Sequence, residues 1–195
     1  MPSPELQQHT PDDLGRFFRS WIRNPLAIGA VAPSGRPLAK RMATGLDEHA
    51  RVIELGAGTG TLTQALFDAG VKPENLYLVE RDPHFLAILG RRFPGCPLIA
   101  ADALHLARHF AGELGSFDYV ISGLPLLLFT PEQRRRLIGQ VFDVLKPNGV
   151  LHQFTYGGRC PLGRELRQDL GIERSLIGFA ALNLPPAFVY RFARV

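Results

Sequence analysis

The sequence contains few cysteines and no long apolar run. Its two cysteines, Cys96 and Cys160, lie far apart without the spacing of metal ligands, so we expect free thiols in a reducing compartment. The longest nearly unbroken apolar stretch, residues 124–129, is far shorter than the roughly 20 residues that a membrane-spanning helix needs. Residues 1–13 are polar and lack the apolar core of a signal peptide. These absences predict a cytoplasmic protein that meets a membrane, if at all, only at its surface.

The chain is long enough for one domain with its own core. It has 195 residues, of which 46% are hydrophobic. Its net charge of +4 and pI near 9.4 allow anionic partners, either nucleic acid or a phospholipid surface, without choosing between them. The pattern predicts one globular domain with an N-terminal head, residues 1–48, and an alternating body, residues 49–195.

Short apolar segments alternate with amphipathic segments along the body. This alternation predicts βαβ units and a mostly parallel sheet. The expected strands are residues 51–55, 75–80, 97–101, 117–122 and 150–156, and the expected helices are residues 61–69, 83–93, 103–111 and 131–145. No helix fits between the last two apolar segments, 172–179 and 187–192, so we expect an antiparallel hairpin there. The predicted fold class is α/β, a doubly wound, Rossmann-like sheet of seven strands that ends in this hairpin.

The strongest motif, Glu54-Leu55-Gly56-Ala57-Gly58-Thr59-Gly60, follows the first expected strand and begins a helix. Glycines there allow a tight turn and close approach of a ligand to the backbone. A dinucleotide fingerprint needs its third glycine at position 61, which is Thr61, and no Gly-Lys-Ser/Thr of a P-loop follows. The pattern resembles that of S-adenosylmethionine-dependent methyltransferases, whose cofactor has no phosphates. A purely structural turn is the alternative.

An acidic residue follows each of the next two expected strands. Glu80 ends the second strand, where a carboxylate can accept both ribose hydroxyl protons. Asp102 ends the third strand, where an acid in this fold accepts a hydrogen bond from the adenine amino group. Asp102 also suits the N-cap of the following helix. Because parallel strands end at one edge of a sheet, we expect the glycine turn and both acids to form one ligand site.

Residues 10–24 predict an amphipathic helix in the head. Its apolar face is formed by Leu14, Phe17, Phe18 and Trp21, and its basic face by Arg16, Arg19 and Arg23. Such a helix either packs on the sheet with its arginines in water or docks on an anionic membrane interface. The cluster Arg134-Arg135-Arg136 has a similar pair of interpretations, a solvated helix face or a contact with lipid phosphate.

Two further motifs carry a closer family resemblance. Gly29-Ala30-Val31-Ala32-Pro33-Ser34 and Ser122-Gly123-Leu124-Pro125 resemble the bacterial phospholipid N-methyltransferases, which convert phosphatidylethanolamine to phosphatidylcholine. The chain is similar, more distantly, to the rRNA adenine dimethyltransferases. Those enzymes carry an Asn-Pro-Pro-Tyr/Phe motif after the fourth strand, whereas Ser122 stands here in place of the Asn and no aromatic residue follows at 124–126. They also carry a C-terminal helical RNA-binding domain, and this sequence ends at its sheet. Both differences disfavour RNA.

The resemblance implies a class I methyltransferase that uses S-adenosylmethionine and releases S-adenosylhomocysteine. It further implies a phosphatidylethanolamine-type lipid substrate and an anionic membrane surface at the inner face of the membrane. The residues implied in membrane contact are Arg16, Phe17, Arg19, Trp21 and Arg23. Nucleic acid is disfavoured as a partner, and we expect a monomer. Methylation of rRNA adenine or of a small soluble molecule is the alternative activity. A binding module without catalysis is a further alternative, which the intact motif disfavours.

The same resemblance implies a set of site residues. Those expected to bind the cofactor are Gly29, Glu54, Gly56, Gly58, Thr59, Gly60, Glu80, Arg81, Asp102, Ala103 and Ser122. Phe129 and Tyr156 are the candidate catalytic residues, because aromatic faces favour a quaternary ammonium product through cation–π attraction. Packing in a core or lid is their alternative role. We expect no metal and find no obvious general base, and His152, in mid-strand, is expected to be a core residue.

Overall fold

The computed structural model describes residues 35–156, 159–180 and 186–195, all of which belong to the unit Ala32–Val195. The predicted head helix, with its five membrane-contact residues, and Gly29 lie outside the described residues. In the part that is described, no helix has the length and apolar character needed to cross a bilayer.

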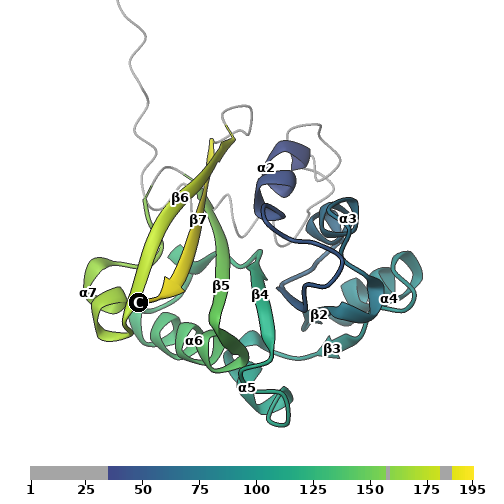
Figure 1. Cartoon of the computed structure of the whole chain (residues 1–195). Coiled ribbons are helices and arrows are strands. Elements are labelled where there is room, and N and C mark those ends of the chain that lie inside the picture. Colours follow the sequence, from purple (N-terminus) through teal and green to yellow (C-terminus); the bar gives the residue numbers. More distant parts are fainter. Residues whose placement is uncertain (1–34, 157–158, 181–185) are drawn as a thin grey trace, which may run out of the picture. The chain divides into compact units, whose positions relative to one another are not determined.

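The described residues form one sheet of seven strands in the order β3-β2-β1-β4-β5-β7-β6 (Figure 1). Strands β1 to β5 pair in parallel, whereas β7 lies antiparallel between β5 and β6. The predicted parallel sheet with a C-terminal antiparallel hairpin is therefore confirmed. The strands are β1 Val52–Leu55, β2 Leu76–Glu80, β3 Leu98–Ala100, β4 Phe117–Ser122, β5 Leu145–Tyr156, β6 Ile172–Ala180 and β7 Ala187–Arg194.

Helices cover both faces of this sheet. The α-helices are α2 Gly35–Met42, α3 Thr61–Asp68, α4 Pro83–Arg92, α5 Leu106–His109, α6 Pro131–Val144 and α7 Arg164–Asp169, and the 3-10 turns are η1 Pro73–Asn75, η2 Ala103–His105 and η3 Leu126–Leu128. Leu151 of β5 belongs to the hydrophobic cluster that includes α6, whereas the next residue, His152, contacts the carbonyl of Met42 in α2. Because successive strand residues point to opposite faces, α2 and α6 lie on opposite sides of the sheet.

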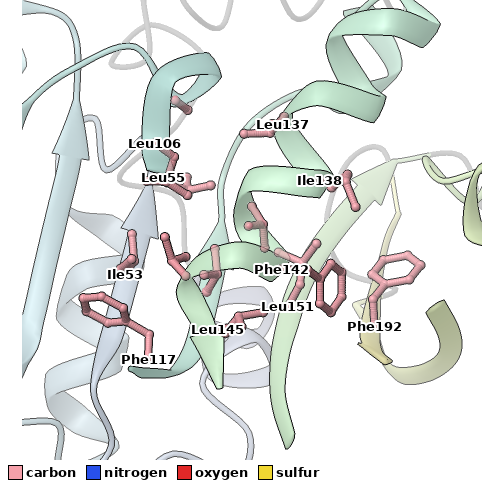
Figure 2. Packing of buried hydrophobic residues seen from close by; sticks show 14 of the residues in the cluster. Ile53, Leu55, Leu106, Phe117, Leu137, Ile138, Phe142, Leu145, Leu151 and Phe192 are labelled. Carbon is pink, nitrogen blue, oxygen red and sulfur yellow. The ribbon is translucent and has the colours of Figure 1, made fainter. Parts of the chain in front are cut away.

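The main core lies between the sheet and the helices α5 and α6 (Figure 2). Phe117, Leu151 and Phe192 enter it from three strands, and Leu137 and Phe142 from α6. On the other face, His152 is 2% exposed and its Nδ1 lies 2.9 Å from the Met42 carbonyl oxygen. Burial lowers the pKa of His152, so the ring is neutral at pH 7. The expected core role of His152 is confirmed.

Two predicted elements differ from the structure. The helix expected at 103–111 is divided into η2 and α5, because the side chain of Gln140 in α6 competes for its backbone groups. Gln140 accepts a hydrogen bond from the amide of Ala107 at 3.1 Å and donates to the carbonyl of Leu104 at 2.7 Å. The fifth strand begins at Leu145 rather than at 150, since Leu145 pairs with Phe117. The register shifts between Phe117 and Tyr119, and the extra residues bulge out of β5 between Leu145 and Val150. This segment contains Pro147, which lacks a ladder donor.

Candidate cofactor site

The predicted site residues of the body meet at one edge of the sheet, where the parallel strands β1 to β5 have their carboxyl ends. The glycine turn follows β1, Glu80 ends β2, Asp102 follows β3, Ser122 ends β4 and Tyr156 ends β5. The strand pairing sets these ends level with one another, since Leu55 pairs with both Val79 and Ser122, and Glu80 pairs with Ala100. The parallel topology therefore gathers residues that lie far apart in the sequence.

The three glycines of the turn have different surroundings. A Cβ added at Gly56 would lie 2.8 Å from Cδ2 of Leu124, and one added at Gly60 would overlap the ring of Phe93. At Gly58 the nearest atom would be 3.9 Å away, although its φ of 55° lies in the left-handed region. A side chain at Gly56 or Gly60 would thus displace a neighbour inside the protein, whereas Gly58 borders open space where a ligand can approach the backbone.

Glu80 connects this turn to the end of β2. Its Oε2 accepts the Gly58 amide at 3.0 Å, and its Oε1 accepts the amides of Arg81 at 2.8 Å and Asp82 at 2.9 Å. The residue is 9% exposed. A carboxylate offers about four acceptor positions, so Oε2 keeps one for a hydroxyl donor. A contact with two hydroxyls would require exchange of one amide bond, and the ribose contact itself stays a prediction.

Asp102 serves as the N-cap of η2, one of its two expected roles. Its Oδ1 accepts the amide of Leu104 at 2.9 Å, and its Oδ2 lies 3.9 Å from Nη1 of Arg81. The Asp102 side chain is 42% exposed, which leaves it accessible to an amino-group donor. The contact with adenine stays a prediction, as do the roles of the exposed Arg81 and of Ala103, which is 8% exposed.

Glu54 is wholly buried and connects β1 to α3. Thr63 donates its hydroxyl proton to Oε2 at 2.7 Å, while Oε1 has no hydrogen-bond partner among the described residues. Burial and, to a smaller extent, the nearby charge of Glu80 raise the pKa of Glu54 to about 8, against the hydrogen bonds with Thr63, which lower it. Glu54 is therefore mainly a neutral acid at pH 7. Its predicted contact with the cofactor is not tested by this geometry.

Ser122 and Gln153 support the segment that follows β4. Ser122 is 1% exposed, and its hydroxyl accepts the amide of Leu124 at 3.3 Å. Gln153, in β5, donates from Nε2 to the carbonyls of Leu124 at 3.0 Å and Phe154 at 2.7 Å. Gln153 was not among the predicted site residues. The available signal was an amide side chain in a strand otherwise predicted to be buried.

The remaining predicted residues lie around the same edge. Thr59 accepts a hydrogen bond at its carbonyl from Arg92, a residue that the sequence analysis did not identify. Phe129 is half-buried and packs against the core after η3. Tyr156 is 9% exposed, and its ring makes an edge contact with Phe154 at 5.4 Å between centroids. The catalytic roles of Phe129 and Tyr156 stay predictions.

The residues present fit a ligand made of an amino acid and a nucleoside. Gly58 leaves room at the backbone, Glu80 retains an acceptor position, and Asp102 presents an accessible carboxylate. Hydroxyl and amino-group donors complement this set of acceptors. Among the described residues, no group of three His, Cys, Asp or Glu side chains is placed to hold a metal ion.

Comparison with known proteins agrees with this geometry. Residues 52–149 match a family model described as a methyltransferase domain. The ornithine lipid N-methyltransferase of Singulisphaera acidiphila is 33% identical over 184 residues, which cover 91% of this chain and 92% of that protein.

Two solved structures share the fold. The TehB-like SAM-dependent methyltransferase of Corynebacterium glutamicum has a TM-score of 0.62 and 16% identity, with 95% of this chain and 100% of that chain covered. The 1,6-didemethyltoxoflavin-N1-methyltransferase of Burkholderia thailandensis, with bound 1,6-didemethyltoxoflavin and S-adenosylhomocysteine, has a TM-score of 0.62 and 15% identity, with 100% and 92% covered.

The contrast between Gly58 and Gly60 yields a first prediction. Gly58→Ala adds a methyl group toward the ligand and should weaken S-adenosylmethionine binding by roughly tenfold, with a stability cost of about 1 kcal/mol for the left-handed backbone. Gly60→Ala forces a methyl group against Phe93 and should cost about 2–3 kcal/mol of stability. Thermal unfolding without ligand and titration calorimetry with S-adenosylmethionine measure the two effects. Equal losses of stability would contradict this division of roles.

A second prediction concerns Glu80. Glu80→Ala should weaken S-adenosylmethionine binding by about tenfold or more, because a charged hydrogen-bond contact contributes roughly 1.5–3 kcal/mol and the turn also loses its attachment to β2. Glu74→Ala removes the same charge from the exposed 3-10 turn before β2 and serves as the control. Calorimetry that gives the parent affinity for Glu80→Ala would remove Glu80 from the site.

A third prediction follows from the raised pKa of Glu54. The folded protein keeps a proton on Glu54 up to about pH 8, whereas the unfolded chain loses it near the ordinary value of 4.5. The contribution of Glu54 to the free energy of unfolding is therefore complete below the unfolded pKa of 4.5. Between that pH and about pH 8 it falls by roughly 1.4 kcal/mol for each pH unit. Glu54→Gln resembles the neutral acid and cannot ionise. Denaturant unfolding should show its stability relative to the parent increasing from about pH 5 to about pH 8, and a pH-independent difference would contradict the assignment.

Proposed function

The chain belongs to the methyltransferase domain family, whose class I members use S-adenosylmethionine, and from that premise we propose that it methylates the amine of a membrane lipid. Phosphatidylethanolamine and its mono- and dimethyl forms are the proposed substrates, with phosphatidylcholine as the product. The observation that carries the proposal is the similarity to a lipid N-methyltransferase over nearly the whole chain. In this proposal residues 1–48 cover the cofactor and substrate, residues 49–195 bind the cofactor, and the protein acts as a monomer at the inner membrane face.

The proposed chemistry asks the protein mainly to position and desolvate its reactants. S-adenosylmethionine supplies a methyl group on a sulfonium sulfur, which is already activated for in-line displacement by an amine. Gly58 leaves space for the cofactor, Glu80 would hold the ribose hydroxyls, and Asp102 would accept from the adenine amino group. These three residues would fix the direction from which an amine must approach.

The acceptor amine must lose its proton before its lone pair can attack. Glu54 is not accessible for this step, since it is fully buried. The oxygens of Glu80 already accept three amides. Water at the open edge is therefore the proposed proton acceptor. Phe129 and Tyr156, near the ends of β4 and β5, are proposed to favour the quaternary ammonium product through their ring faces.

An ornithine lipid is a second candidate substrate, because the similar enzyme from Singulisphaera acidiphila carries that name. Both candidates present an amine on a lipid, so the same cofactor geometry serves either. RNA is a weaker alternative. Ser122 is buried and accepts a backbone amide, whereas a nucleobase contact at this position needs an accessible polar side chain.

A parallel assay tests the proposed function. The full chain is supplied with methyl-labelled S-adenosylmethionine and detergent-dispersed phosphatidylethanolamine, ornithine lipid or ribosomal RNA in separate reactions. We expect label in the phosphatidylethanolamine fraction, and loss of that label with Glu80→Ala but not with Glu74→Ala. Label in ornithine lipid alone would replace the proposed substrate, and label in RNA alone would overturn the lipid assignment.

A further inference from the structure

The hairpin of β6 and β7 extends to the edge of the sheet that holds the candidate site. Phe188, near the start of β7, pairs with Thr155 of β5 on one side and with Phe179 of β6 on the other. Phe179 therefore lies level with Thr155, next to the end of β5. Because neighbouring strands lie about 4.8 Å apart, Phe179 lies roughly 10 Å across the sheet from Thr155.

A β-bulge places two large apolar side chains on one face of this hairpin. In a regular strand Leu176 and Phe179 would point to opposite faces. The register shift after Leu176 inserts Ile177, so that Leu176 pairs with Tyr190 and Phe179 pairs with Phe188. Tyr190 and Phe188 are two residues apart on β7 and share a face. Leu176 and Phe179 therefore share that face as well.

This face changes from buried to exposed along its length. Phe192 lies further along β7 on the same face and is 0% exposed, within the core cluster. Leu176 is 57% exposed and Phe179 is 44% exposed, with the Phe179 ring 4.8 Å from that of Phe188. The apolar face of the hairpin thus continues out of the core and ends, among the described residues, in two partly exposed side chains beside the site.

Positive charge borders the exposed part. Arg174, two residues before Leu176, is exposed on the same face, and its guanidinium lies 5.7 Å from the centre of the Tyr190 ring. Arg159 is exposed shortly after the end of β5. Neither arginine forms an ion pair with a carboxylate of the described residues. Glu173, the acidic neighbour of Arg174, points to the opposite face because side chains alternate along the strand.

We propose that this hairpin face, formed by Arg174, Leu176, Phe179 and Phe188, docks on an anionic phospholipid bilayer and sets the site edge against the membrane. Leucine and phenylalanine enter the boundary between headgroups and acyl chains, while arginine meets lipid phosphates. The inference rests on the proposed lipid substrate, because an amine at the bilayer surface is reached only if the site edge faces it.

Charge complementarity favours a bilayer over a second copy of the chain. A two-fold contact through the same face would bring together two surfaces that each carry Arg174, with no acidic residue on that face of β6 to compensate. An anionic lipid surface supplies the missing negative charge. The exposed apolar side chains then leave water without pairing two like-charged surfaces.

Vesicle co-sedimentation of the full chain tests the docking face. The vesicles contain equal parts of phosphatidylcholine and phosphatidylglycerol, with pure phosphatidylcholine as the neutral comparison. The test variant is Leu176→Ser with Phe179→Ser. Its control is Leu114→Ser. Leu114 is 52% exposed in the loop before β4, at the opposite end of the parallel strands from the candidate site. Arg174→Gln tests the charge, with Arg91→Gln, exposed in the last turn of α4, as its control.

We expect the double serine variant to lose roughly tenfold in partitioning to anionic vesicles, since two half-exposed apolar side chains no longer leave water. Arg174→Gln should bind anionic vesicles several-fold more weakly than Arg91→Gln and should reduce the difference between anionic and neutral vesicles. Equal binding by the double serine and Leu114→Ser variants would overturn the proposal. So would a parent dimer that becomes monomeric in the double variant without a change in vesicle binding, because the face would then be a self-interface.

The failure of this inference is distinguishable from that of the proposed function. Methylation of detergent-dispersed phosphatidylethanolamine requires the site but no bilayer, so the double serine variant should keep the parent rate there and lose rate only with vesicles. A double variant that loses both rates equally while keeping its thermal stability would assign Leu176 and Phe179 to the site itself and overturn the docking role. Absence of lipid methylation in the parent would overturn the proposed function, while the vesicle-binding comparison would still decide whether the face docks.

Discussion

A hydrogen bond from the Gly58 amide to the Glu80 carboxylate holds the glycine turn against the second strand. The turn and the strand end belong to different βα units, and this contact sets the distance between them. The same carboxylate accepts the amides of Arg81 and Asp82, which shapes the start of α4. The position of the turn, the exit of the chain from β2 and the acceptors available to a ligand therefore all depend on one acidic side chain. A residue that builds the site is also proposed to bind within it.

The parts of the fold that depend on residues close together in the sequence could be predicted from the sequence. Apolar periodicity located every strand to within a few residues except the start of β5, and the order of glycines and acids located the site edge. The missed features depend on partners distant in the chain. Gln140 of α6 divides the helix expected at 103–111, and Gln153 of β5 supports the carbonyl of Leu124. A single glutamine in a sequence carries no signal of which backbone group it will meet.

The two acids of the turn region have different surroundings. Glu80 accepts three backbone amides, whereas Glu54 is wholly buried and accepts one threonine hydroxyl. The charge of the first disfavours ionisation of the second. The sequence motif shows both only as acids near a glycine turn. Glu54 pairs with Leu78, so Glu54 and Glu80 lie on the same face of the sheet. Their different roles depend on position along the strands, since Glu54 lies within β1 against Thr63 of α3 and Glu80 ends β2 beside the turn.

Contact between Gly60 and the ring of Phe93 has a consequence for how this motif diverges among related chains. The third glycine is small because an aromatic ring at the end of α4 occupies the space that a side chain would need. The two positions should therefore vary together. Where a relative carries asparagine or another residue that accepts a left-handed backbone in place of Gly60, a smaller side chain should replace Phe93. Loss of the third glycine from such a chain then marks a repacked neighbour rather than a decayed site.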